Sequence, residues 1–239
     1  MDKSDYSNEY YKKKITEYYG VRLDSPNIRW KLIYQFFFES NDYDSRFNVL
    51  MNMTDDEIWY VINIPAGSNF TFPIIGAKGS LRLLKAIINK KPDYLGYVSI
   101  VTKAVDFNRF NIIKYLMTLN DKDIHNALKE VFIYAIRMGN IAIVKLYLNN
   151  SKFVIDDIES FYNSELGFDT YAGGSPDIPE HGEDIKSTSI KYILDNVLKI
   201  DRPDIHAEMM FLLLEDNRIT SHLSKQQIQK YISKLEKGG

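Results

Sequence analysis

The chain has 239 residues, of which 45% are hydrophobic and 26% are charged, a composition typical of a soluble globular protein. Its formal net charge of -2 provides no overall field that would attract nucleic acid, and the absence of cysteine excludes disulfides, thiolate metal sites and a cysteine nucleophile. No apolar run reaches the roughly 18 residues of a membrane span and the first residues lack the apolar core of a secretory signal, so we expect a cytoplasmic protein without membrane contact.

The first helix is predicted near the N-terminus. In a helix, Tyr11, Ile15 and Tyr18 would share one stripe, and we expect that stripe to pack against the rest of the fold. A second helix is predicted after Ser25 and Pro26, because serine suits the N-cap position and proline suits the first helical turn.

A third helix is predicted to begin after Thr54. Glu57 follows three residues later, which is the spacing of a capping box, in which each side chain binds the backbone N–H of the other residue. Together, residues 1–68 are expected to form irregular helices, either as a separate N-terminal cap or as degenerate copies of the units that follow.

Residues 69–152 carry one pattern three times. Each copy has an apolar stretch, then a glycine or asparagine at Gly79, Asn108 or Gly139, then an apolar pair followed by lysine. Glycine and asparagine tolerate the left-handed conformation that ends a helix, so each copy predicts a tight helix-turn-helix. The aligned apolar pairs and lysines are Leu83-Leu84-Lys85, Ile112-Ile113-Lys114 and Ile143-Val144-Lys145.

The copies recur after about 29 and 31 residues, which is typical of a repeat protein. Ala104 and Ala135 occupy the same position in their copies, and we expect both to be buried where neighbouring helices approach closely.

This pattern resembles the ankyrin repeat, whose motif has an alanine-rich inner helix, a glycine turn and an outer helix of the form Leu-x-Val-Val-Lys-Leu-Leu. The Thr-Pro-Leu-His start and the Asp-x-x-Gly finger of that family are missing from all copies. The resemblance implies an all-α fold, an α-solenoid of antiparallel helix pairs that binds other proteins and has neither catalytic residues nor a cofactor. The divergent copies are also similar to the ankyrin proteins that large DNA viruses and intracellular bacteria encode, which implies a host protein as partner and the host cytoplasm as location.

Residues 153–186 depart from the repeat pattern and are predicted to form an insertion. From Phe153 to Ile185 there are nine acidic residues and no lysine or arginine, and Gly173-Gly174, Pro176 and Pro179 break any helix after about Leu166. Three interpretations stay open, namely a solvated loop, a contact with a basic partner, or a site for a hard cation such as Ca²⁺, although the spacing does not fit an EF-hand. The residues that would make the partner contact are Asp156, Asp157 and Glu159.

Residues 187–239 are predicted to form a degenerate repeat and C-terminal capping helices. One of these helices should start at Pro203, since proline suits the first helical position.

The function expected from these observations is that of a non-enzymatic protein-interaction module. Binding along the concave face of the solenoid would use the ends of the inner helices, where apolar residues occur at positions that should face solvent. The predicted partner-binding residues there are Lys78, Asp106, Phe107, Arg137 and Met138.

Two alternatives come from single motifs. The first is an enzyme of unrecognised type, because His181 lies between Glu180 and Glu183, although no known catalytic or metal-binding spacing occurs. The second is a ubiquitin-ligase substrate adaptor, because Glu57-Ile58-Trp59 resembles the start of an F-box helix without its preceding Leu-Pro.

Overall fold

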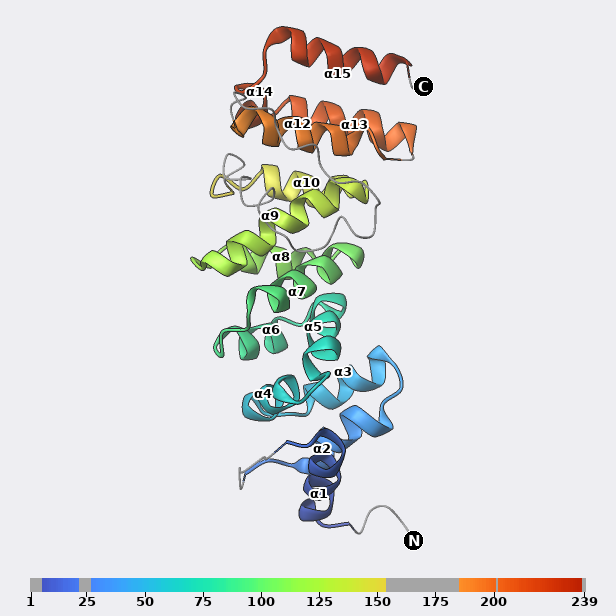
Figure 1. Cartoon of the computed structure of the whole chain (residues 1–239), viewed down its shortest axis with the longest axis vertical. Coiled ribbons are helices and arrows are strands. Elements are labelled where there is room, and N and C mark those ends of the chain that lie inside the picture. The colour runs from blue at the N-terminus through green and yellow to red at the C-terminus, as the bar shows by residue number, and fades with distance from the viewer. Residues whose placement is uncertain (1–5, 22–26, 154–184, 201, 238–239) are drawn as a thin grey trace. The chain divides into compact units, whose positions relative to one another are not determined.

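The computed structural model describes residues 6–21, 27–153, 185–200 and 202–237, and within these ranges the chain is all-α without a strand (Figure 1). No helix in the same ranges is both long enough and apolar enough to cross a membrane. The chain divides into two compact units, Met1–Leu116 and Met117–Gly239. The domain boundaries predicted after residues 68, 152 and 186 stay predictions.

The helices of the first unit are α1 (Asn8–Tyr19), α2 (Trp30–Tyr34), the π-helical turn η2 (Gln35–Glu39), α3 (Tyr43–Met51), α4 (Asp55–Asn63), α5 (Gly67–Lys78), α6 (Leu81–Ile88), α7 (Tyr94–Asp106) and α8 (Phe110–Leu116). Those of the second unit are α9 (Lys122–Arg137), α10 (Ile141–Leu148), α12 (Ile185–Val197), α13 (Pro203–Leu214), α14 (Asn217–Thr220) and α15 (Lys225–Lys237).

The three predicted turns are confirmed. Gly79 separates α5 from α6, Asn108 separates α7 from α8, and Gly139 separates α9 from α10. Their φ angles are 68°, 53° and 64°, which lie in the left-handed region that glycine and asparagine adopt more easily than other residues. The two helices of each pair pack against each other.

The core of the first unit depends on a close crossing of α5 and α7. A Cβ atom added at Gly76 of α5 would lie 2.2 Å from the carbonyl oxygen of Ile100, and one added at Gly96 of α7 would lie 2.7 Å from the ring of Phe72. Neither position has room for a side chain, so the two backbones approach more closely than helices with larger residues allow. Ala104, also on α7, is fully buried, as predicted.

Side chains of the first unit satisfy the carbonyl groups at helix ends. Three hydrogen bonds join a side-chain N–H to a backbone carbonyl 32 residues earlier, at the C-terminal ends of α3 and α5. The last turn of a helix leaves carbonyl groups without an intrahelical donor, and these bonds supply one. They are Arg82 Nη1 to Leu50 O (3.1 Å), Arg109 Nε to Ala77 O (2.7 Å) and Asn111 Nδ2 to Gly79 O (2.7 Å).

The second unit uses the same device after α10. The guanidinium of Arg218 donates to the carbonyls of Leu148 (2.6 Å), Asn150 (3.3 Å) and Phe153 (3.0 Å). Asp216 accepts from the same guanidinium at 2.6 Å, so the charge of the arginine is also paired. Pro203 is the first residue of α13, as predicted.

The core between α9 and α10 is aromatic. The rings of Phe132, Tyr147 and Phe153 have centroids 4.8 to 5.3 Å apart, and Ala135 beside them on α9 is fully buried, as predicted. The hydroxyl of Tyr147 is buried and has no hydrogen-bond partner among the described residues.

One expectation for the N-terminal helix is wrong. Tyr11 and Ile15 of α1 are buried, but Tyr18 is 71% exposed. The three residues share a stripe, yet the packing partner covers only part of it, and the ring of Tyr18 rests against the edge of Phe38 at 5.1 Å instead. The predicted helix start at Ser25 and Pro26 lies outside the described residues.

Candidate functional site

The first unit contains three of the predicted partner-binding residues, all at the ends of helices. Lys78 is the last residue of α5 and forms an ion pair with Asp44. Asp106 is the last residue of α7 and forms an ion pair with Lys103 at 2.8 Å. Phe107 follows it and is 50% exposed, so it presents apolar area to solvent next to Asp106, whose charge is paired within the unit.

The second unit contains Arg137 and Met138. Arg137 is half-buried, where its Nε donates to Asn196 Oδ1 at 2.8 Å and its Nη2 to the hydroxyl of Tyr192 at 2.6 Å. These bonds connect α9 to α12, which is a structural role that the sequence did not indicate. Met138 is 60% exposed at the turn before Gly139. The predicted contact residues Asp156, Asp157 and Glu159, like His181, lie outside the described residues.

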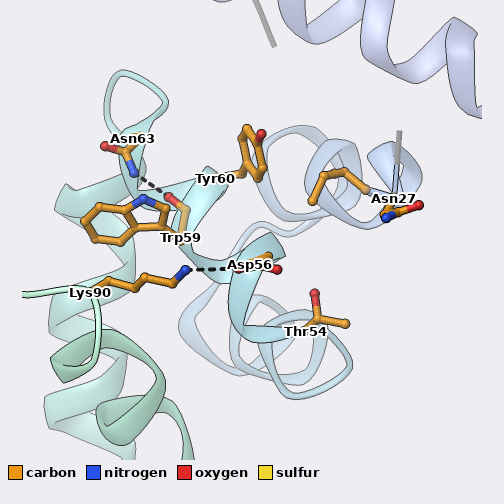
Figure 2. A pocket seen from close by; sticks show the side chains of 8 residues that line it. Asn27, Thr54, Asp56, Trp59, Tyr60, Asn63 and Lys90 are labelled. Atoms are coloured by element: carbon orange, nitrogen blue, oxygen red, sulfur yellow. Dashed lines mark hydrogen bonds and ion pairs between the residues drawn. The ribbon is translucent and has the colours of Figure 1, made fainter. Parts of the chain in front are cut away.

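A pocket in the first unit was not predicted from the sequence. It has a volume of about 620 Å³, within the range of small-molecule and side-chain binding sites (Figure 2). We call it the α4 pocket, because half of its lining residues lie on that helix. The lining residues are Asn27, Ile28, Thr54, Asp56, Trp59, Tyr60, Asn63 and Lys90.

Helix α4 has two faces, one that lines the pocket and one that packs against the core. Asp56, Trp59, Tyr60 and Asn63 follow the spacing i, i+3, i+4 and i+7, which places them on one side of a helix. The side facing the core is formed by different residues, which are buried. They are Glu57, Ile58 and Val61.

The polar groups of the α4 pocket are only partly engaged (Figure 2). Lys90 Nζ lies 3.1 Å from Asp56 Oδ1, and Asn63 Nδ2 donates to the carbonyl of Trp59 at 2.7 Å. The side chain of Asp56 is 73% exposed, and that ion pair uses one of its two oxygens. The side chain of Asn27 is exposed at the rim of the pocket. The pocket therefore offers exposed donors and acceptors next to two aromatic rings.

The N-terminus of α4 is fixed by the predicted capping box, which is confirmed. Thr54 Oγ1 accepts from the backbone N–H of Glu57 at 3.2 Å, and Glu57 Oε2 accepts from the backbone N–H of Thr54 at 2.8 Å. The sequence did not indicate the third participant, Arg29, which donates to Glu57 from its backbone N–H (2.8 Å), from Nε (2.8 Å) and from Nη2 (2.6 Å).

Glu57 is fully buried, and its carboxylate accepts four hydrogen bonds. Burial raises the pKa of Glu57, but the hydrogen bonds from the Arg29 side chain and from the backbone of Thr54 and Arg29 lower it from an ordinary 4.5 to about 2. The negative charge of Glu57 is therefore satisfied inside the fold, whereas the negative charge of Asp56, one residue earlier, faces the pocket.

The sequence contains the helical spacing that places Asp56, Trp59 and Asn63 on one face of α4, but this spacing alone does not predict a pocket. Ile28 precedes Thr54 by 26 residues, and Lys90 follows Asp56 by 34 residues. Only the tertiary fold brings these two distant segments to α4. Among the described residues there is no group of His, Asp and Glu side chains that could hold a metal ion.

Comparisons with known proteins found no match to this chain. No protein-family model, no curated protein and no solved structure matches it.

Proposed function

We propose that the chain is a non-enzymatic protein-interaction module, built as an ankyrin-like solenoid of antiparallel helix pairs, that captures a host or cellular protein. The observation that carries this proposal is a side-chain to carbonyl connection across 32 residues that occurs twice in succession, from α6 to the end of α3 and, through two bonds, from the start of α8 to the end of α5. Helix pairs that repeat along a chain and stack on their neighbours produce contacts at one fixed separation. Each helix pair of such a fold ends its first helix at an equivalent turn, and we take the exposed residue at such a turn as a binding position within its own unit.

Apolar exposure at these turns supports binding of a protein. Phe107 and Met138 each occupy the position just before a left-handed turn residue, and they are 50% and 60% exposed. Aromatic and methionine side chains are enriched at the centres of protein interfaces, because they bury a large area. Arg137 is satisfied within its own unit, so the proposal rests on the two apolar residues rather than on the arginine.

Affinity capture from cells of the native host tests this function. The wild-type chain should retain a stoichiometric protein partner, and Phe107→Ser or Met138→Ser should reduce capture at least about tenfold if the residue is at the centre of the interface. The matched control is Leu95→Ser, because Leu95 is 57% exposed but lies in the first turn of α7, away from the turn positions.

Two results would contradict the proposal. Equal loss of capture in the Leu95→Ser variant would show that exposed apolar area in general, and not the turn positions, retains the partner. Turnover of a small molecule that is lost in His181→Ala, without a stoichiometric partner, would favour the enzyme alternative.

A further inference from the structure

We propose that the α4 pocket binds an arginine side chain from an extended segment of the partner protein. The inference deepens the proposed function, on which it rests for the identity of the partner as a protein. The binding itself is a property of the pocket and can be measured with a short peptide.

The second oxygen of Asp56 favours a cation. Asp56 extends into the pocket with one oxygen engaged by Lys90, whereas Asp55 beside it lies outside the lining, 4.0 Å from Arg82. Acidic residues in the first turn of α4 already occupy the end of the helix that would otherwise attract an anion. A carboxylate-bearing or phosphate-bearing ligand would meet Asp56 at close range, whereas a cation would gain an ion pair.

The aromatic wall favours arginine among the cations. Trp59 and Tyr60 are half-buried and line the pocket next to Asp56, which lies one helical turn earlier (Figure 2). A planar guanidinium can stack on an indole face and simultaneously direct its N–H groups to a carboxylate, while a compact ammonium does only one of these well.

Lys90 shows that the pocket accepts a positive charge. Its ammonium lies 3.1 Å from Asp56 Oδ1, and in Figure 2 its side chain extends below Trp59 toward that carboxylate. The side chain of Lys90 is 38% exposed, so it can move away from Asp56. Lys90 therefore competes with an incoming arginine, which has to displace it or share the carboxylate of Asp56 with it.

The remaining polar groups suit a peptide backbone. Asn63 lies above the Trp59 ring and Asn27 lies on the far side of Tyr60 (Figure 2), and the amide oxygen of Asn63 and the exposed amide of Asn27 line the same pocket. An asparagine amide offers both a donor and an acceptor, as a peptide unit does, so the two can bind the main chain on either side of the arginine.

The test is a titration of the full chain with the capped pentapeptide acetyl-Ala-Ala-Arg-Ala-Ala-amide, observed through the tryptophan indole N–H signals in a ¹H–¹⁵N spectrum. The chain has two tryptophans. Trp59 lines the pocket and gives the direct signal, whereas Trp30 is 1% exposed and contacts the pocket only through Tyr60, whose ring lies 5.8 Å away. We expect the arginine peptide to shift the Trp59 signal, and its glutamine counterpart to bind at least about fivefold more weakly.

Two variants should act in opposite directions. Asp56→Asn should weaken binding of the arginine peptide about two- to fivefold, and Lys90→Ala should strengthen it by a similar factor, because the variant removes the competing cation. The matched controls are Glu208→Gln and Lys145→Ala, which disrupt an exposed ion pair of the same 3.1 Å length outside the pocket and should leave binding unchanged.

Equal binding of the glutamine peptide, or loss of binding in Lys90→Ala, would overturn the assignment. A Trp59 signal that responds to neither peptide would overturn it as well. The peptide test can fail without refuting the proposed function. If partner capture depends on Phe107 but the peptide does not bind, only the role of the α4 pocket is refuted.

Discussion

In the first unit the carboxylate of Glu57 is fully buried and accepts hydrogen bonds from Arg29 and Thr54, whereas in the second unit the hydroxyl of Tyr147 is buried without any hydrogen-bond partner among the described residues. Both groups lie in well-packed surroundings. The first is stabilised by directed contacts, while the second is retained because the ring that carries it fills space between Phe132 and Phe153.

The difference shows that the surroundings of Glu57 and those of Tyr147 derive their stability from different sources. Directed bonds fix one geometry and fail together when one partner is lost, because the others are then buried without compensation. Aromatic packing depends on shape, so it tolerates a hydroxyl that contributes nothing, but it does not tolerate added volume. The following predictions separate these two kinds of stability, from the largest expected effect to the smallest.

Glu57→Ala should have the largest effect, a loss of about 3 kcal/mol of unfolding free energy. The change leaves the backbone N–H groups of Thr54 and Arg29 without their acceptor and the guanidinium of Arg29 without its counter-ion. Urea denaturation followed by tryptophan fluorescence measures the effect, since Trp30 and Trp59 both lie in the first unit. A loss below about 1 kcal/mol would mean that the network is not stabilising.

Acid should remove the contribution of Glu57 while leaving the packing around Tyr147 intact. The folded pKa of about 2 lies below the ordinary value of 4.5, so the stabilisation is fully present above about pH 4.5 and is lost as pH falls toward 2. Its full size is about 3 kcal/mol, at about 1.4 kcal/mol per pH unit. Urea midpoints between pH 2 and 6 should therefore converge for the wild type and Glu57→Gln as the pH falls, and parallel curves would contradict the assignment.

Ala135→Leu should destabilise the second unit by about 1 to 3 kcal/mol, because the added volume has no space at a fully buried position on α9. Thermal unfolding by circular dichroism measures the loss. The control is Ala142→Leu, since Ala142 is exposed on α10 and should change stability by less than about 0.5 kcal/mol. Similar losses in both variants would show that leucine disturbs these helices for a reason other than packing.

Tyr147→Phe should stabilise the second unit by about 1 kcal/mol, the smallest effect, because the variant removes a buried hydroxyl that has no partner and leaves the ring in place. Tyr231→Phe serves as the opposite case, since the hydroxyl of Tyr231 donates to Asp195 Oδ1 at 3.3 Å and its removal should not stabilise. If Tyr147→Phe destabilised the protein, the hydroxyl would have a partner after all.

The sequence predicted those features that depend on neighbours along the chain. The turns at Gly79 and Gly139 follow from the conformational freedom of glycine, and the Thr54 capping box follows from a spacing of three residues. Burial of Ala135 followed from the alignment of the copies, and the structure confirms it.

Features that depend on distant segments were missed or predicted wrongly. Arg29 reaches Glu57 across 28 residues, and no local pattern indicates that pairing. Tyr18 has the right spacing for a buried stripe, but the extent of the covering element determines its exposure. The same reason explains why the face of α4 that carries Trp59 did not predict a pocket.

The side-chain caps of the helix ends have a consequence for the order of synthesis. A ribosome adds residues from the N-terminus, so the carbonyl of Leu50 is made 32 residues before Arg82, its later donor. At about 5 to 20 residues per second, each such helix end stays open to water or to a chaperone for roughly 2 to 6 s. The interval is longer at Leu148, whose donor Arg218 follows 70 residues later, so the second unit is the last to close its helix ends as the chain emerges.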